Sequence, residues 1–277
     1  MNMSELDRHV KAALLDAANR AIMPRFLPGK AIAADYKAVG EAVTEADRES
    51  EDILATHLAR LIPGIGIVGE ESVHHDATQL DQLGSGACWI IDPLDGTGNF
   101  AQGLQPFGML IALANAGIPI AGWIFDPTSG RLCSAHVNQG AFIDGERLRT
   151  EQSSPDIPIV AVTKLFADAN SRNTAIASLT RTCEVVDSPR CAADQYPRVA
   201  LGGNDATVFT RTIAWDHAAG VVFLNEAGGM AACLDSTPYR CDRPDNGLII
   251  AKNAAVWTHV VNALNSGNII LKGAHLT

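Results

Sequence analysis

The spacing of apolar residues changes partway along the chain, and the order of the patterns restricts the fold more than any other feature. Apolar residues recur every four positions from Leu6 to Ile22, which predicts a helix that Pro24 ends. A second helix is predicted after Thr44, which can cap its first turn, and Pro63 stops it. Short apolar runs between glycines and prolines then predict strands at residues 65–68, 88–91, 109–114 and 118–125, and a hairpin at residues 140–147.

The second half of the chain has a different pattern, which begins after the polar, proline-containing stretch 150–158. Strand-like and helix-like runs alternate there, with strands predicted at residues 159–162, 183–186, 206–209 and 247–251 and helices at residues 167–179, 191–201, 215–227 and 254–264. We therefore predict an N-terminal α+β half with an antiparallel sheet over residues 1–153 and a C-terminal α/β half over residues 154–277. We expect the two halves to pack through a shared interface.

The charge balance narrows the possible partners. The chain has 277 residues, 47% of them hydrophobic, and a formal net charge of −10, which is typical of a globular protein with a sizeable core. Because no block of consecutive basic residues occurs, the composition argues against nucleic acid as a partner. An acidic chain can still bind a phosphate dianion where metal ions or directed N–H groups reverse the local field.

The N-terminal segment and the cysteines bear on the cellular compartment. The first twenty residues carry charges throughout and lack the apolar core of a signal peptide, and no stretch is long and apolar enough to span a membrane. The six cysteines form no C-x-x-C pair, which favours reduced, buried thiols over a disulfide framework or a zinc site. These features predict a cytoplasmic protein without a membrane partner.

Acidic residues gather in three short segments that could bind a metal ion. Glu70 follows a predicted strand, and Asp92 and Asp95 both project from a single turn after another predicted strand. Asp216 begins an amphipathic run at the position of a helix N-cap. Mg²⁺ prefers oxygen ligands, so a turn that supplies two carboxylates and a free carbonyl suits it. Each segment by itself has a simpler explanation: Glu70 could lie in a solvated loop, the Asp pair could serve only to form a turn, and Asp216 could serve only to cap a helix.

Small residues directly after the Asp pair add a second feature. Gly96, Thr97 and Gly98 leave their N–H groups open to a phosphate oxygen, particularly if a helix begins there. Metal and phosphate could thus share one loop.

Together these segments resemble the pattern of the inositol monophosphatase superfamily. That pattern is a Gly-Glu-Glu, then an Asp-Pro-x-Asp-Gly-Thr, then a distant Trp-Asp-x-Ala-Gly-type segment; here the three begin at Gly69, Asp92 and Trp215. Residues 43–47 and 226–229 extend the resemblance to residues 5–265. The resemblance implies a layered αβαβα sandwich of the sugar-phosphatase type, with the active site between the N-terminal and C-terminal halves of one chain. It also implies that two such chains form a homodimer. It also implies two or three Mg²⁺ ions per site, with Mn²⁺ as a possible substitute and Li⁺ as an inhibitor.

The resemblance also assigns roles to individual residues. For a first metal ion, the residues that match the family's ligands are Glu70, Asp92 and the Leu94 carbonyl. For a second ion they are Asp92, Asp95 and Asp216. A third ion would be bound by Glu70. Thr97 matches the catalytic group that would orient the attacking water, and Asp47 or Glu70 would support the Thr97 hydroxyl. Gly96 and Thr97 would donate N–H groups to the phosphate, whereas His217 is interpreted as a helix-surface or packing residue rather than a base.

The segments that would contact the leaving group depart from the family pattern. Members that prefer inositol phosphates usually carry Gly-Ser/Thr-Ala-Ala where this chain has Arg190, Cys191, Ala192 and Ala193. A glutamate that binds sugar hydroxyls is replaced by Phe209, with Arg211 two residues on. Arginine pairs with anions in a bidentate manner, so this wall fits a second phosphate, a carboxylate or a planar ring better than a bare polyol.

Several functions therefore remain compatible with the sequence. The main prediction is Mg²⁺-dependent hydrolysis of a small phosphate monoester by water, with inositol or another sugar phosphate, a 3′(2′),5′-bisphosphate nucleotide, fructose 1,6-bisphosphate and histidinol phosphate as candidate substrates. A regulatory or RNA-processing partner protein on the same fold is the non-enzymatic alternative. The intact set of acids argues for catalysis, because a binding protein has no evident need for every metal ligand.

Overall fold

The computed structural model describes residues 3–38, 41–163, 169–243 and 247–267. Its first helix, α1 (Met3–Ala17), continues through one π-helical segment, η1 (Ala18–Ile22), and one 3₁₀ turn, η2 (Met23–Arg25). The second helix, α2 (Glu45–Leu61), begins at the predicted Thr44 cap, whose hydroxyl accepts a hydrogen bond from Ala46 N at 3.2 Å. Both predicted helices are confirmed. A short pair of strands, β1 (Asp35–Ala38) and β2 (Glu41–Val43), lies between them and was not predicted.

A seven-stranded sheet follows, with its strands in chain order. They are β3 (Gly66–Gly69), β4 (Ala87–Asp95), β5 (Gly108–Asn115), β6 (Ile118–Asp126), β7 (Arg131–His136), β8 (Gly140–Ile143) and β9 (Glu146–Leu148). The prediction of an antiparallel sheet is wrong for one pair, because β3 runs parallel to β4. Parallel strands need a crossover connection, and α3 (Glu70–His75) with η3 (Ala77–Gly84) supplies it. The sequence prediction missed β7 and these two helical segments.

The second sheet has five strands in the order β11-β10-β12-β14-β13. They are β10 (Ile159–Val162), β11 (Glu184–Asp187), β12 (Ala206–Phe209), β13 (Met230–Ala232) and β14 (Leu248–Ala251), and only β13 was not predicted. The helices are α5 (Ala169–Leu179), α6 (Ala192–Ala200), α7 (Ala214–Glu226) and α8 (Ala254–Asn265). The predicted start of α5 at residue 167 lies outside the described residues. β10 pairs in parallel with β11 and β12, whereas β14 is antiparallel to its neighbours.

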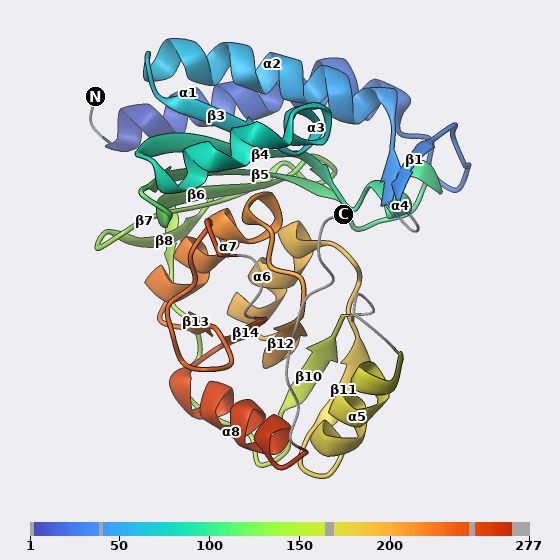
Figure 1. Ribbon diagram of the computed structural model, residues 1–277, viewed down its shortest axis with the longest axis vertical. Helices are drawn as coiled ribbons and strands as arrows, with labels where there is room; N and C mark the ends of the chain where they lie inside the picture. Colours follow the sequence, from blue (N-terminus) through green and yellow to red (C-terminus); the bar gives the residue numbers. More distant parts are fainter. Residues whose placement is uncertain (1–2, 39–40, 164–168, 244–246, 268–277) are drawn as a thin grey trace.

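Helices and sheets alternate in layers, as Figure 1 shows. From top to bottom these are α1 with α2, the seven-stranded sheet, α6 with α7, the five-stranded sheet, and α5 with α8. Buried apolar residues fill the spaces between the layers in three clusters: one between α1/α2 and the first sheet, one on both sides of α6 and α7, and one between the second sheet and α5/α8. The expected αβαβα sandwich is therefore confirmed.

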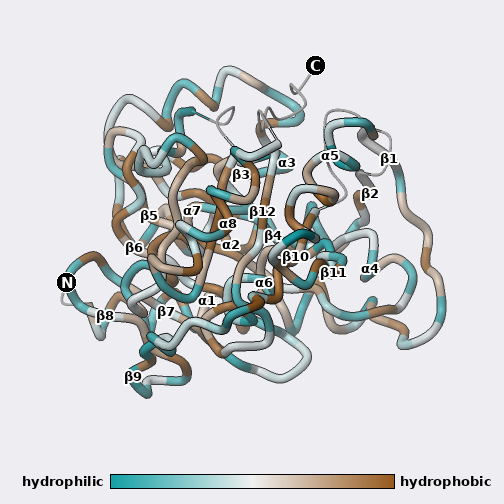
Figure 2. Tube along the Cα trace, turned by 90° about the horizontal axis from the view of Figure 1, so that it is seen from below, coloured by the Kyte–Doolittle hydropathy of each residue, from teal (hydrophilic) through white to brown (hydrophobic). Residues whose placement is uncertain are grey.

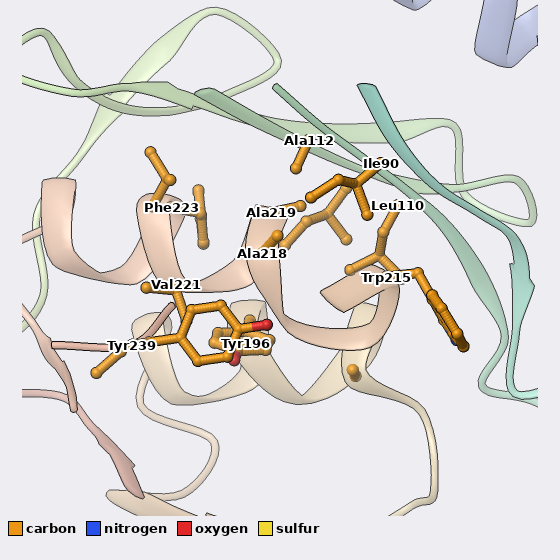
Figure 3. Close-up of a cluster of buried hydrophobic side chains, with 14 of the residues drawn as sticks. Ile90, Leu110, Ala112, Tyr196, Trp215, Ala218, Ala219, Val221, Phe223 and Tyr239 are labelled. Carbon is orange, nitrogen blue, oxygen red and sulfur yellow. The ribbon is translucent and has the colours of Figure 1, made fainter. Parts of the chain in front are cut away.

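Helix α7 lies at the centre of this arrangement. Most of its residues are buried on all sides, as expected of a helix that is apolar around its whole circumference. Figure 3 shows Ala218 and Ala219 between the strand residues Leu110 and Ala112 and the ring of Tyr196 from α6. The approach to β6 is so close that a Cβ atom on Gly122 would collide with the backbone of Ala219. The close packing of α7 against β6 fixes the position of the residues of α7 relative to the first sheet.

The distribution of apolar residues agrees with a folded core. In Figure 2 hydrophobic segments cross the centre of the molecule, and hydrophilic ones are frequent in the outer loops. All six cysteines are buried and free, as predicted. Among the described residues, none of the helices is long and apolar enough to cross a membrane.

Candidate active site

An irregularity in β4 brings two acids to one place. Asp92 lies opposite Leu110 of β5 and Asp95 lies opposite Gly108, so three steps along β4 match two steps along β5. Residues three apart on a regular strand face opposite sides, and one extra residue, a β-bulge, brings them to the same side. Pro93 lies in this bulge, where the regular hydrogen bonding between the strands is interrupted and the missing N–H of proline is tolerated. The strand predicted to end at residue 91 therefore continues to Asp95, and the acids belong to a bulge rather than to a turn after the strand.

A pocket opens at this bulge and encloses about 940 Å³, its open mouth included. Its walls contain every residue that the sequence analysis assigned to metal, phosphate or substrate, namely Glu70, Asp92, Leu94, Asp95, Gly96, Thr97, Arg190, Cys191, Ala192, Phe209, Arg211 and Asp216. The pocket is also lined by residues that the analysis did not assign to the site: Ala42, Gly98, Asn99, Thr163, Ser188 and His217.

Asp47 lies behind the pocket wall. Its Oδ2 accepts hydrogen bonds from Thr44 N and Thr44 Oγ1, each at 2.7 Å, and its Oδ1 lies 2.9 Å from Thr97 Oγ1. Burial raises the pKa of Asp47 to about 6, although the hydrogen bonds from Thr44 oppose the shift. The same Thr97 hydroxyl lies 2.8 Å from Leu94 O. Thr97 therefore connects the buried carboxylate of α2 to the bulge of β4.

Glu70 is positioned by a carboxylate from another helix. Glu70 begins α3, and the next two N–H groups, of Glu71 and Ser72, donate to Glu51 Oε2 and Oε1 at 2.7 and 2.8 Å. The Glu51 carboxylate so fills the N-terminus of α3 that a Cβ atom on Gly69 would collide with it. The sequence analysis did not predict this role of Glu51.

A helix begins after the Asp pair, which is the condition under which the N–H groups of this loop would suit a phosphate oxygen. Gly96 has φ 82°, a left-handed conformation that glycine adopts freely, and it is the N-cap of α4 (Thr97–Ala101). The amide of Asn99 in this helix donates to Pro106 O at 2.8 Å and to Pro189 O at 3.1 Å. Asn99 thus ties the loop after β4 to the C-terminal half.

Asp95 makes a second connection between the halves. Its Oδ2 accepts a hydrogen bond from Ala193 N at 2.6 Å, in the first turn of α6. Burial raises the pKa of Asp95 to about 6, while backbone hydrogen bonds from Ala193, Ala192 and Gly96 lower it. For Asp92, burial raises the pKa well above its ordinary value, and the charges of Glu70, Asp95, Asp216 and Asp47 raise it further.

Asp216 enters the pocket from α7, but not from the predicted N-cap. The N-cap is Ile213, so Asp216 occupies the third position of the helix. Beside it, His217 is buried, with Nδ1 3.0 Å from Tyr196 Oη and Nε2 3.0 Å from Arg211 O. Because a carbonyl accepts, Nε2 carries the hydrogen and Nδ1 accepts from the tyrosine. Burial lowers the pKa of His217 to about 3, so it is neutral and serves packing, as the sequence indicated.

The opposite wall is built at the ends of parallel strands. Thr163 follows β10, Ser188 follows β11, and Phe209 ends β12, two residues before Arg211. Ligands of α/β sheets commonly bind at the carboxyl ends of parallel strands. A polar residue within two positions of the end of each of these predicted strands was the signal that could have identified Thr163 and Ser188 from the sequence.

The chemistry of the acids fits divalent cations. Four carboxylates raise the pKa of Asp92 through their charge, so the charged form of this buried group needs positive charge nearby. Within the described ranges, no three His, Cys, Asp or Glu side chains are arranged so that they could hold a metal ion as a group. Mg²⁺ keeps several waters and takes only one or two carboxylates, so it does not require a closed protein cage.

Comparison with known proteins gives a consistent result. The sequence profile of the inositol monophosphatase family matches residues 2–266. The chain is 30% identical over 259 residues to the inositol-1-monophosphatase of Mesorhizobium japonicum, covering 92% of this chain and 94% of that protein. It is 30% identical over 271 residues to the histidinol-phosphatase of Mycobacterium tuberculosis, covering 96% and 100%.

Among solved structures, the extragenic suppressor protein suhB of Bartonella henselae is similar in fold, with a TM-score of 0.81 at 24% identity over 95% of this chain and 99% of that one. Members of the family that the profile describes are generally metal-dependent. By its sequence over nearly its whole length, the chain belongs to the inositol monophosphatase family of phosphatases.

Proposed function

We propose that this phosphatase hydrolyses small phosphate monoesters with Mg²⁺ held by the acids around the β4 bulge. The observation that carries the proposal is the convergence of Glu70, Asp92, Asp95 and Asp216 on one pocket beside the Thr97 hydroxyl. These acids come from three separate elements, α3, the bulged end of β4 and α7, so neither turn chemistry nor helix capping accounts for their meeting.

The ligands divide between two ions. Glu70, Asp92 and the Leu94 carbonyl would hold the first, and Asp92, Asp95 and Asp216 would hold the second, with Glu70 able to contribute to a third. Bound Mg²⁺ supplies Lewis-acid stabilisation of the phosphate and of the departing alkoxide. Asp95 can serve the second ion with Oδ1 while Oδ2 keeps its hydrogen bond to Ala193 N.

Thr97 and Asp47 would orient the attacking water. A hydroxyl has one hydrogen, and when the Leu94 carbonyl is engaged elsewhere, that hydrogen goes to Asp47 Oδ1 at 2.9 Å. The Thr97 oxygen then accepts a hydrogen from water and directs a water lone pair toward phosphorus. Gly96 and Thr97, at the start of α4, would direct N–H groups toward the phosphate oxygens.

The proposal includes the remaining expectations from the family resemblance. They are Mn²⁺ as a substitute metal, inhibition by Li⁺, a homodimer and a cytoplasmic location. Buried free cysteines suit a reducing compartment.

A phosphate-release assay tests the proposal. Purified protein is treated with EDTA and assayed on p-nitrophenyl phosphate, inositol 1-phosphate, adenosine 3′,5′-bisphosphate, fructose 1,6-bisphosphate and histidinol phosphate. We expect no release in EDTA and recovery with excess Mg²⁺ or Mn²⁺, because hard cations prefer these oxygen ligands. Full activity in EDTA, or no hydrolysis of any ester with Mg²⁺, would contradict the proposal.

A further inference from the structure

The pocket wall that faces the acids carries two arginines, and the backbone of each is fixed by a side chain that also lines the pocket. Arg190 follows β11 and Arg211 follows β12, at the carboxyl ends of the two strands that flank β10 in the five-stranded sheet. Asn99 holds the turn of Arg190, and His217 holds the carbonyl of Arg211.

Arg190 has a backbone conformation that its side chain makes unfavourable. Its φ is 61°, in the left-handed region that glycine occupies freely and other residues rarely adopt. Residues in such regions persist where the surrounding structure determines them, and they cluster at functional sites. A glycine would remove the strain, so the chain keeps an arginine at a position better suited to glycine.

The turn that contains Arg190 is held from both sides. Asn99 Nδ2 donates to Pro189 O at 3.1 Å, and Arg190 N lies 3.4 Å from Ser188 Oγ. Directly after the turn, Ala193 N is bonded to Asp95 Oδ2 at 2.6 Å. The position of Arg190 is therefore set relative to the metal-binding loop of the other half.

Arg211 is fixed in a comparable way. Its carbonyl accepts a hydrogen bond from His217 Nε2 at 3.0 Å, and His217 is itself bonded to Tyr196 Oη at 3.0 Å. Opposite this wall, a Cβ atom on Gly98 would meet no other atom within 4 Å, so the pocket has room beyond the acids.

We infer that Arg190 and Arg211 form a subsite for a second anionic group, so that the preferred substrate is a phosphate monoester whose leaving group carries a phosphate or a carboxylate. The inference rests on the proposed hydrolysis at the acidic side of the same pocket. Guanidinium groups bind both oxyanions through paired hydrogen bonds. Asn99 and His217 are positioning residues, since each contacts the backbone of an arginine segment.

A matched set of three-carbon esters tests the subsite. Glycerol 3-phosphate has a neutral leaving group, 3-phosphoglycerate adds a carboxylate, and glycerol 1,3-bisphosphate adds a phosphate. We expect the wild-type protein to show a kcat/KM about ten- to a hundredfold higher for at least one anionic ester, the range that one charge-assisted hydrogen bond provides. The ester with the higher value identifies the anion, and equal values for all three would contradict the inference.

Variants separate the subsite from general damage. Arg190→Gly removes the guanidinium and suits the left-handed turn, so it should fold with an undiminished melting temperature while losing most of the preference for the anionic ester. Arg198→Ala is the matched control: it also removes one positive charge, from an exposed pair with Asp194 at 2.8 Å, and should keep the preference. A preference that survives Arg190→Gly and Arg211→Ala would overturn the inference.

Asn99→Ala tests the positioning role. It should lower the same preference, and adding Arg190→Gly to it should then change the preference little, because both act through one turn. If the two substitutions instead lowered the preference independently, so that their effects multiplied in the double variant, the coupling would be contradicted. If wild-type protein fails to hydrolyse even p-nitrophenyl phosphate with Mg²⁺, the proposed function fails rather than the subsite alone.

Discussion

Glu51 holds the first turn of α3 from a neighbouring helix, and the direction of the Glu70 side chain depends on that turn. The two Glu51 oxygens lie 2.7 and 2.8 Å from the N–H groups of Glu71 and Ser72. Hydrogen bonds to a charged group contribute about 1.5–3 kcal/mol each. A carboxylate with two oxygens suits two donors, whereas an amide has only one accepting oxygen.

Glu51→Gln should therefore weaken metal binding without removing any proposed ligand. The amide NH₂ must face one of the two N–H groups, so α3 shifts and Glu70 is held less firmly. Loss of such a supporting contact typically lowers metal affinity about tenfold or more. Calorimetric titration of metal-free protein with Mg²⁺ measures it, with Glu49→Gln, an exposed change in the same helix, as the control. Equal affinities for Glu51→Gln and wild type would show that α3 does not depend on this cap.

The sequence analysis proposed residues for the chemistry but not the residues that support them. Asp92, Asp95 and Thr97 stand in one short motif, whereas Glu51 meets Glu71 across 20 positions and Asn99 meets Pro189 across 90. One signal was present for Glu51. Asp47, Glu51, Leu54 and Leu58 fall on one face of the predicted helix, and acids on an apolar face are expected only with buried partners.

At the scale of elements, prediction succeeded where local pattern determines structure. The Thr44 cap and the strands β10 and β12 were predicted with the observed bounds, because apolar runs and turn residues define them. β7 (Arg131–His136) was missed because only its pairing between β6 and β8 makes it a strand. The parallel pairing of β3 and β4 also followed from tertiary contacts rather than from either strand's sequence.

The β4 bulge shows why an element's geometry matters for function. The sequence placed Asp92 and Asp95 in a turn, but the strand continues and its extra residue turns both acids to the pocket. Ser50 Oγ donates to Pro93 O at 3.2 Å and so ties the bulge to α2. The spacing of three residues therefore has a structural reason, which the sequence alone did not reveal.

At the scale of the whole molecule, the crowded acids predict an unusual pH dependence of stability. In the metal-free protein burial raises the pKa values of Asp47 and Asp95 to about 6 and raises that of Asp92 well above its ordinary value. These groups take up protons in the folded state well above the pH, near 4, at which the unfolded chain does. Their contribution therefore increases stability as pH falls from 7 to 5 and is lost as pH rises through 6.

His217 has the opposite effect. Its pKa is lowered to about 3, so below about pH 6.5 the unfolded chain gains a proton that the folded protein does not. Three carboxylates outweigh one histidine, and the metal-free melting temperature should rise between pH 7 and 5. Saturating Mg²⁺ keeps the proposed ligands Asp92 and Asp95 charged, so only Asp47 then opposes the histidine effect and the melting temperature should no longer rise. Thermal unfolding in EDTA and in Mg²⁺ checks both signs; parallel curves would contradict the assignment of the acids to metal.

The halves of the molecule meet at the site itself. Asp95 is bonded to Ala193 N and Asn99 to Pro189 O, while α7 brings Asp216 against the first sheet. The layered packing thus determines the site geometry. The central claim is that the acids collected by this packing hold the metal ions that drive phosphate ester hydrolysis.

Mg²⁺-dependent phosphate release by Asp92→Asn tests that claim most directly. Asp92 is proposed to ligate both ions, so we expect kcat/KM for p-nitrophenyl phosphate to fall by more than about a hundredfold, beyond the usual effect of a supporting residue. The neutral amide relieves charge burial, so the metal-free variant should melt no lower than wild type. Asp205→Asn, a buried change outside the pocket that disrupts a pair with Lys252, should lose stability but keep activity at low temperature. Wild-type turnover by Asp92→Asn would contradict the account.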